Sequence, residues 1–383
     1  MTIAKLGELI QPAKVKRAGD GDFPLLSMTM RNGLVPQGEK FKKRVAGADL
    51  SQYKVVQHNQ LVVGFPIDEA VLAFQRSIPA GIVSPAYGVW DLADKVASDA
   101  PYLERFLRSP RAIAYYKAKL QGSTARRRSL PNPVFLDMEV PLPPLVEQRR
   151  ITAILDKADK IRAKRREALA RLDTLTQSIF HSMFSGQPAH TPLSDAIAGL
   201  TGGRNLVGAE DGSNPFRVLK ISAVTSGRYL ESESKALPDG YIPPKDHIVR
   251  QGDVLISRAN TTELVGASAL VESTTGTSAL PDKLWRAIPA VGVDPRFLIA
   301  TLQSAATRAE ISRRATGSGG SMKNISKPKL LAIPISLPPF ELQQTFATRV
   351  AAVERFKETH RKHLAELDAL FASLQHRAFN GEL

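Results

Sequence analysis

The segment LPPLVEQRRI at residues 142–151 has a near copy, LPPFELQQTF, at residues 337–346. The two copies lie 195 residues apart, and this repeat shift aligns residues 122–186 with residues 317–381 without a gap. Gln148 falls on Gln343 and Gly186 on Gly381. A register that holds over such a length predicts an internal repeat, and a repeat decides the fold before any single motif does.

Each copy predicts an extended entry followed by one long amphipathic helix. The Pro pair ends any earlier helix, because a residue before proline avoids the helical region. Apolar residues then recur at intervals of three and four, as on one helix face: Ile151, Ile154, Ala158, Ile161, Ala168, Leu172, Leu175 and Ile179, then Phe346, Val353, Phe356, Leu367, Leu370 and Leu374. Gly186 and Gly381 follow, where C-terminal caps are expected.

These helices would each be about 38 residues and roughly 57 Å long. A helix of this length with a single apolar stripe is not stable alone, so its simplest partner is the other helix in an antiparallel pair. The predicted fold is α+β, with a pseudo-two-fold axis relating the copies. Its parts are a globular domain at 1–140, a long helix at 141–186, a second globular domain at 187–335 and a second long helix at 336–383.

The two globular segments share a plan of short strands. Residues 23–34 and 216–230 each predict a strand, a loop with Gly and another strand, and residues 53–65 and 247–258 each predict two β-branched runs broken by a turn. Short helices are expected at 101–120 and 295–314. Most other side chains differ between the segments, so two similar frames carry different surfaces.

The charge of the chain favours a polyanionic partner. It contains 52 Lys and Arg against 37 Asp and Glu, a net charge of +15, and the excess is spread through segments that are expected to fold. Structured basic surfaces are typical of DNA- or RNA-binding proteins. The sequence has no Cys, which excludes disulfides and thiolate zinc sites, and no apolar run suited to a bilayer, so we expect a cytoplasmic protein.

Several motifs resemble the specificity subunits of type I restriction–modification systems. They are LPPLVEQ, the helix ILDKADKIRAKRREALARLDTLTQSIFHSMF, the closing LDALFASLQHRAFNGEL, and GSGGSMKNISKPKLLAIPISLPP and SPAYGVW within the globular segments. The resemblance covers essentially the whole chain. One departure is ELQQTF in the second copy, where the first has EQRRI, so the resemblance supports a contact at the first helix entry more directly than at the second.

The resemblance implies that each globular domain is a target-recognition domain that reads half of a bipartite double-stranded DNA sequence. It also implies that the helices set the spacer and dock two methyltransferase subunits, and that an ATP-driven restriction and motor subunit joins the complex. S-adenosylmethionine, ATP and Mg are then expected in the partner subunits, and no cofactor is expected on this chain.

The sequence shows no catalytic or metal-binding constellation. Residues 132–135, Asn-Pro-Val-Phe, lack the second Pro of an adenine methyltransferase box and are expected to form a turn before a strand. Residues 317–321 lack the Lys of a phosphate-binding loop and are expected to be a flexible connection. A freestanding DNA-binding regulator, a specificity module of another defence system and a nuclease remain alternative functions.

Candidate DNA-contacting residues are chosen as clusters of basic side chains, because phosphate contacts position a protein on DNA. They are Lys40, Lys42, Lys43, Arg44, Arg126, Arg127, Arg128, Arg258, Lys283, Arg313, Arg314 and Lys323.

Two further residues are candidates for fixing the register of the helices. Arg165 interrupts the apolar series of the first helix, and its equivalent under the repeat shift, His360, interrupts the second. Both lie near mid-helix, so in an antiparallel pair they are expected to approach each other as a polar layer.

Overall fold

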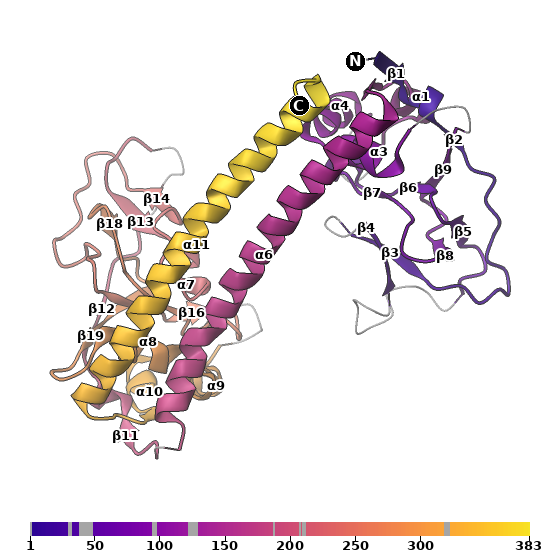
Figure 1. Ribbon diagram of the computed structural model, residues 1–383. Helices are drawn as coiled ribbons and strands as arrows, with labels where there is room; N and C mark the ends of the chain where they lie inside the picture. Colours follow the sequence, from indigo (N-terminus) through magenta and orange to yellow (C-terminus); the bar gives the residue numbers. More distant parts are fainter. Residues whose placement is uncertain are drawn as a thin grey trace. The chain divides into compact units, whose positions relative to one another are not determined.

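The computed structural model describes residues 2–29, 33–37, 49–93, 98–121, 129–186, 188–206, 208, 212–317 and 322–383. The chain divides into two compact units: unit 1 is Met1–Arg165 with His363–Leu383, and unit 2 is Arg166–Lys362. Each unit holds one globular region and part of each of two long helices, α6 (Leu145–Phe184) and α11 (Phe340–Asn380) (Figure 1). The two predicted long helices are therefore confirmed.

The globular region of unit 1 combines short strands with a helical layer. Its strands are β1 (Thr2–Lys5), β2 (Ile10–Pro12), β3 (Leu26–Thr29), β4 (Gly33–Pro36), β5 (Lys54–Gln57), β6 (Leu61–Val63), β7 (Leu72–Phe74), β8 (Ala80–Val83), β9 (Gly88–Leu92) and β10 (Glu139–Leu142). Its helices are α1 (Leu6–Leu9), the 3-10 helix η1 (Ile67–Glu69), α3 (Ala100–Leu107), α4 (Pro110–Lys119) and α5 (Asn132–Leu136). The largest sheet has the antiparallel order β2-β9-β6-β7, and β1 pairs with β10.

The globular region of unit 2 has a similar plan. Its strands are β11 (Thr191–Pro192), β12 (Ile197–Gly202), β13 (Arg217–Leu219), β14 (Ser234–Ala236), β15 (Val254–Ser257), β16 (Ala259–Asn260), β17 (Ser268–Leu270), β18 (Ser278–Ala279), β19 (Leu284–Pro289), β20 (Lys323–Asn324) and β21 (Pro334–Ile335). Its helices are η3 (Leu193–Asp195), α7 (Ser222–Thr225), α8 (Pro295–Gln303), α9 (Ala305–Arg314) and α10 (Lys327–Leu331). The largest sheet is again antiparallel, in the order β12-β19-β15-β17.

Corresponding elements of the two units begin at positions related by the repeat shift. This holds for α3 and α8, α4 and α9, α5 and α10, and α6 and α11. Their N-terminal caps match as well: the carboxylate of Asp99 accepts from the Tyr102 N–H and that of Asp294 from the Arg296 N–H, while Ser109 and Ser304 cap the next helices. Such caps satisfy N–H groups that a helix start leaves without partners.

The helices pair in antiparallel fashion within each unit. In unit 1, Ile151 and Leu155 of α6 share a buried core with Ala378 and Phe379 of α11. In unit 2, Phe180 and Phe184 of α6 lie 5.6 and 5.5 Å from Phe346 of α11, ring centre to ring centre. The beginning of α6 thus meets the end of α11, and the end of α6 meets the beginning of α11, as the sequence predicts.

The prediction of one buried apolar stripe on each long helix is wrong at four positions. Ile161 and Leu175 of α6 are 42% and 39% exposed, and Phe356 and Leu370 of α11 are 63% and 51% exposed. The apolar face of each helix is therefore wider than the seam between the helices. Leu155, absent from the predicted stripe, is fully buried.

Two local predictions also need correction. Residues 216–230 contain one strand, β13, followed by the short helix α7, because the next strand begins only at Ser234. Residues 132–135 belong to the short helix α5 and not to a turn, with Pro133 in its first turn, where a missing N–H costs nothing. The paired strands at 26–36, the helices within 101–120 and 295–314, and the two glycine caps, with φ of 89° at Gly186 and 79° at Gly381, agree with the sequence.

A buried glutamine joins each long helix to its globular region. The side-chain oxygen of Gln148 accepts the Asp99 N–H at 2.8 Å, and its amide donates to the Pro143 carbonyl at 2.8 Å. Gln343 does the same for the Asp294 N–H at 3.0 Å and the Pro338 carbonyl at 2.8 Å. The glutamine amide therefore holds the Pro-Pro entry and the start of α3 or α8 in one geometry.

Replacing Gln343 by Leu is expected to destabilise the protein by about 1–3 kcal/mol, because the Asp294 N–H and the Pro338 carbonyl lose their partner in a buried place. Urea denaturation measures the loss. Gln344→Leu is the matched control, because Gln344 is the exposed neighbour. Its replacement should change the free energy of unfolding by about 0.5 kcal/mol or less. Equal losses in both variants would contradict a specific role for the buried amide.

Candidate nucleic-acid interface

Seven of the predicted DNA-contacting residues lie outside the described residues. They are Lys40, Lys42, Lys43, Arg44, Arg126, Arg127 and Arg128. These seven stay predictions. The described candidates all belong to unit 2.

Three of the described candidates come from separate segments and gather at one end of the unit 2 sheet. The Arg258 N–H donates to the Lys283 carbonyl at 3.0 Å, and the Arg258 guanidinium donates to the Asp282 carbonyl at 2.7 Å. Strands β16 and β20 pair so that Lys323 lies opposite Asn260, two residues beyond Arg258. Sequence reasoning therefore named residues that the fold brings together, although they are far apart along the chain.

Arg313 and Arg314 have a different environment. Both end α9, and both donate to the carboxylate of Glu310, at 2.6 and 3.0 Å, while Arg314 also donates to the Ala332 carbonyl at 3.1 Å. The hydrogen bonds from the two guanidinium groups lower the pKa of Glu310, so this carboxylate stays charged. One negative charge thus offsets part of the positive charge that the cluster offers to a phosphate.

Sequence reasoning missed two lysines beside this end of the sheet. Lys220, Lys235 and Lys283 line a hollow of about 310 Å³, together with Asn205 and Asp282. The β13–β14 ladder, in which Val218 faces Lys235, brings the first two together. No local motif marks them, because the proximity comes from strand pairing. Lysine side chains from three separate segments line this hollow, which makes it a suitable site for phosphate oxygens.

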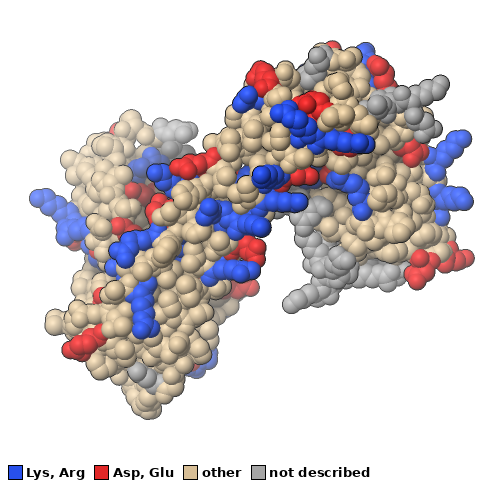
Figure 2. Space-filling view, viewed as in Figure 1, with Lys and Arg blue, Asp and Glu red and all other residues tan. Residues whose placement is uncertain are grey.

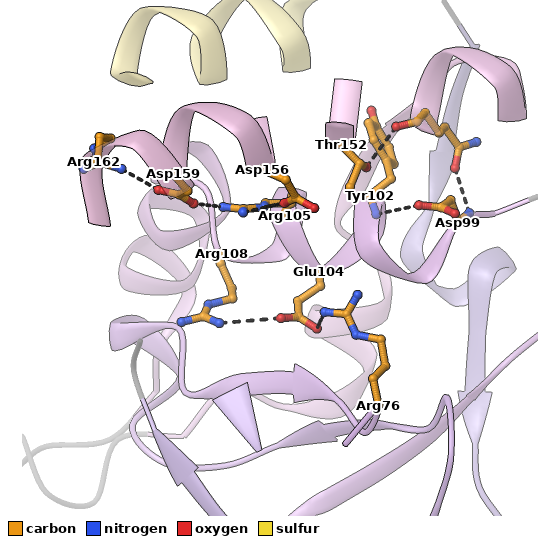
Figure 3. A network of polar contacts seen from close by, with 11 residues as sticks. Arg76, Asp99, Tyr102, Glu104, Arg105, Arg108, Thr152, Asp156, Asp159 and Arg162 are labelled. Carbon is orange, nitrogen blue, oxygen red and sulfur yellow. Dashed lines mark hydrogen bonds and ion pairs between the residues drawn. The ribbon is translucent and has the colours of Figure 1, made fainter. Parts of the chain in front are cut away.

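An ionic network joins the globular region of unit 1 to α6 (Figure 3). Arg105 of α3 donates to Asp156 at 2.6 Å and also contacts Asp159, which accepts from Arg162 at 2.7 Å. On the other side of α3, Glu104 accepts from the Phe74 N–H at 2.9 Å and from Arg76 at 3.0 Å. The network therefore connects strand β7, helix α3 and helix α6.

Ion pairs also link α6 with α11. Arg162 pairs with Asp368 at 2.6 Å and lies over the Phe371 ring, 4.2 Å from its centre. In unit 2 the equivalent positions are Lys357 and Asp173, which pair at 3.2 Å. The repeat shift maps Arg162 onto Lys357 and Asp173 onto Asp368. The cation therefore lies on α6 in the first pair and on α11 in the second. On the face shown in Figure 2, Lys and Arg side chains are frequent along the long helices.

The prediction for Arg165 and His360 is not tested by these contacts. Arg165 belongs to unit 1 and His360 to unit 2. Their approach stays a prediction.

The described residues contain no group of three or more His, Asp or Glu side chains that could hold a metal ion. Within the same residues, no helix is both long and apolar enough to cross a bilayer.

Comparisons with known proteins point to one kind of protein. No protein-family model matches the chain. The EcoEI type I restriction enzyme specificity subunit of Escherichia coli is 34% identical over 127 residues, 33% of this chain and 21% of that protein. The EcoKI specificity subunit of Escherichia coli K12 is 25% identical over 64% of this chain and 58% of its own length. The MjaVIII specificity subunit of Methanocaldococcus jannaschii is 22% identical over 100% of this chain and 92% of its own length. The chain thus matches about a fifth of the length of the EcoEI subunit and somewhat more than half of the length of the EcoKI subunit.

Two solved structures share the fold over the whole chain. A chain from a study of complex assembly and conformational transition in a type I R-M system has a TM-score of 0.59 at 17% identity, and the match covers 100% of this chain and 98% of that one. The S subunit of a type I restriction–modification system from M. genitalium has a TM-score of 0.56 at 13% identity, and the match covers 99% and 96%. The mixed α/β architecture with two globular regions is therefore shared. The curated relatives of this chain are type I restriction enzyme specificity subunits and its structural neighbours come from type I restriction–modification systems, so the resemblance predicted from the sequence is confirmed.

Proposed function

We propose that this chain is the DNA-recognition subunit of a type I restriction–modification complex. Each globular region reads one half of a bipartite, asymmetric duplex target, and α6 and α11 set the spacer between the halves. The chain is not catalytic by itself and acts in the cytoplasm. S-adenosylmethionine, ATP and Mg belong to its partner subunits.

The observation that carries this proposal is the recurrence of one frame under the repeat shift. The caps at Asp99 and Asp294 and the buried amides of Gln148 and Gln343 are made twice, with similar distances. We take the two copies of this frame to be related by the pseudo-two-fold axis that the sequence repeat predicts. Duplex DNA also has two-fold axes, so such a protein can present equivalent surfaces to two half-sites.

The division of labour between the globular regions is testable by replacement. A chain whose residues 1–140 come from a relative should methylate a target with one altered half and one preserved half, because each region has its own sheet and core. Mapping of methylated adenines in genomic DNA from cells with the complete complex measures this. The reciprocal replacement of residues 187–335 is the control and should alter the other half.

Two outcomes contradict the proposal. If both halves change in one replacement, the two regions do not read separately. If removal of this gene leaves genomic methylation unchanged, the chain is better described as a freestanding DNA-binding regulator.

The lysine hollow of unit 2 provides a second test. Replacing Lys220, Lys235 and Lys283 by Ala should weaken binding to every DNA sequence and reduce the slope of log affinity against log salt by about 0.9 for each phosphate that is no longer neutralised. Fluorescence anisotropy measures binding from about 50 to about 200 mM salt. Arg313→Ala should change the slope by less than about 0.5, because Glu310 already offsets its charge. An unchanged slope in the triple variant would place DNA elsewhere.

The exposed apolar residues of the long helices support a further proposal, that two identical partners dock on them. Ile161 is next to Arg162 and Leu370 is two residues from Asp368, so the ion pair holds together the turns that carry them. Phe356 and Leu175 are the equivalents in unit 2, beside the pair of Lys357 and Asp173. Two equivalent apolar surfaces on a duplicated frame fit two copies of one partner, the methyltransferase subunit.

Charge at one of these surfaces should remove one partner. The variant with Ile161→Glu and Leu370→Glu, and separately the variant with Phe356→Glu and Leu175→Glu, should each bind one methyltransferase subunit where the unmodified chain binds two. Native mass spectrometry counts the subunits. Ile288→Glu, at a 45% exposed apolar residue of β19, is the control and should keep both. Two subunits bound to each double variant would exclude these surfaces.

A further inference from the structure

The strand ladders define equivalent positions in the two sheets. Leu61 of β6 faces Trp90 of β9, and Ile256 of β15 faces Trp285 of β19. Both members of the first pair map onto the second under the repeat shift, which therefore extends to the sheets. The shift places Phe65, four residues after Leu61, at the position of Asn260, and Tyr87, three residues before Trp90, at the position of Asp282. The end of the unit 2 sheet that carries Arg258 and Lys283 therefore has a counterpart in unit 1.

Two aromatic side chains occupy this end in unit 1. Phe65 is 56% exposed, and its ring centre lies 6.3 Å from that of the half-buried Tyr87, with the planes tilted by 55°. A Cβ atom at Gly64 would lie 3.3 Å from the Tyr87 ring, so this ring packs directly against the backbone that carries Phe65. The packing holds Phe65 outward while much of its ring remains in solvent.

Cationic groups lie beside the aromatic pair. The ammonium of Lys54 donates to the Tyr87 carbonyl at 2.5 Å, and Arg17 is paired with Lys54 in a β-bridge. Burial, and then the charge of Arg17, lower the pKa of Lys54 from its usual value. Within the described part of unit 1, no carboxylate is paired with the Lys54 ammonium. Aromatic rings next to cationic side chains are the composition that nucleic-acid-binding surfaces use.

The same positions in unit 2 carry hydrogen-bonding groups. Asn260 lies opposite Lys323 in the β16–β20 ladder, and the Asp282 carboxylate is 3.6 Å from the Arg258 guanidinium. One sheet end therefore offers apolar surface and the other donors and acceptors. In the major groove of B-DNA, the apolar group that a base pair presents is the C5-methyl of thymine.

We propose that Phe65 and Tyr87 form the base-contacting surface of unit 1 and recognise a thymine methyl group in one half of the DNA target. This inference rests on the proposed function, because it assumes that unit 1 reads DNA. Lys54 and Arg17 hold the adjacent phosphates, and Tyr87 positions the ring of Phe65.

The test uses the full chain assembled with its methyltransferase subunits, on duplexes that carry the target found by methylation mapping. Deoxyuridine replaces one thymine at a time and removes only the methyl group. In the unmodified complex, one such replacement in the unit 1 half should weaken binding roughly tenfold. Phe65→Ala should weaken binding to the thymine duplex by a similar factor and should be insensitive to that replacement. Tyr87→Phe, which keeps the ring, should retain most of the discrimination.

Ile3→Ala is the matched control, because Ile3 is 57% exposed in the same unit but lies on β1, which pairs with β10 next to the entry of α6. Thermal melting shows whether each variant is folded, and little change is expected at exposed side chains.

Three results overturn the inference. One is a Phe65→Ala complex that binds and discriminates as the unmodified complex does. Another is a unit 1 half in which no uridine replacement matters. The third is loss of methyltransferase subunits from the Phe65→Ala complex, which would make Phe65 a protein contact. If the unmodified complex methylates no bipartite sequence, the proposed function fails as well.

Discussion

Each long helix has one apolar stripe and cannot bury it alone, so α6 and α11 must pack on each other. This constraint brings the beginning of one helix beside the end of the other, as the shared core of Leu155 and Phe379 shows. Each globular region attaches at the entry of its own long helix, where Gln148 of α6 binds the start of α3 and Gln343 of α11 binds the start of α8. Breaking these hydrogen bonds is costly, because the buried groups could not bond to water instead. The bonds therefore hold each region rigidly to its helix. The attachment of each globular region thus depends on hydrogen bonds within its own unit.

The helices could be predicted because their signal is local. The apolar spacing, the Pro pair and the terminal glycines each involve residues that are close in sequence. The structure has a helix start after each Pro pair and a glycine with positive φ after each helix end. Ile161, Leu175, Phe356 and Leu370 were misassigned for a physical reason: an apolar side chain gives the same periodic signal whether it faces another helix of the chain or solvent. Only the exposed fraction of each side chain separates the two cases.

The candidate interface could be predicted only in part. Arg258, Lys283 and Lys323 were chosen for charge, and strand pairing does bring them together. Lys220 and Lys235 were missed because a β-ladder between distant segments creates their proximity and leaves no motif. The pairing of Arg313 and Arg314 with Glu310 could have been predicted, because residues three and four apart are neighbours on a helix surface. The basic residues within 38–48 and 122–128 remain predictions, as does the contact between Arg165 and His360.

The positions that recur in both units and those that differ have separate physical roles. Asp99 and Asp294, Gln148 and Gln343, and Trp90 and Trp285 bond to the backbone or fill a core, so they maintain the frame. The sheet ends carry different chemistry, with Phe65 where unit 2 has Asn260. The attachment differs too, since Ala300 stands where Arg105 joins α3 to α6. Because the side chains at the sheet ends take no part in the caps and buried amides that hold each region, they can differ without disturbing those bonds. One frame can therefore present two unrelated surfaces, as the proposed recognition of a bipartite asymmetric target requires.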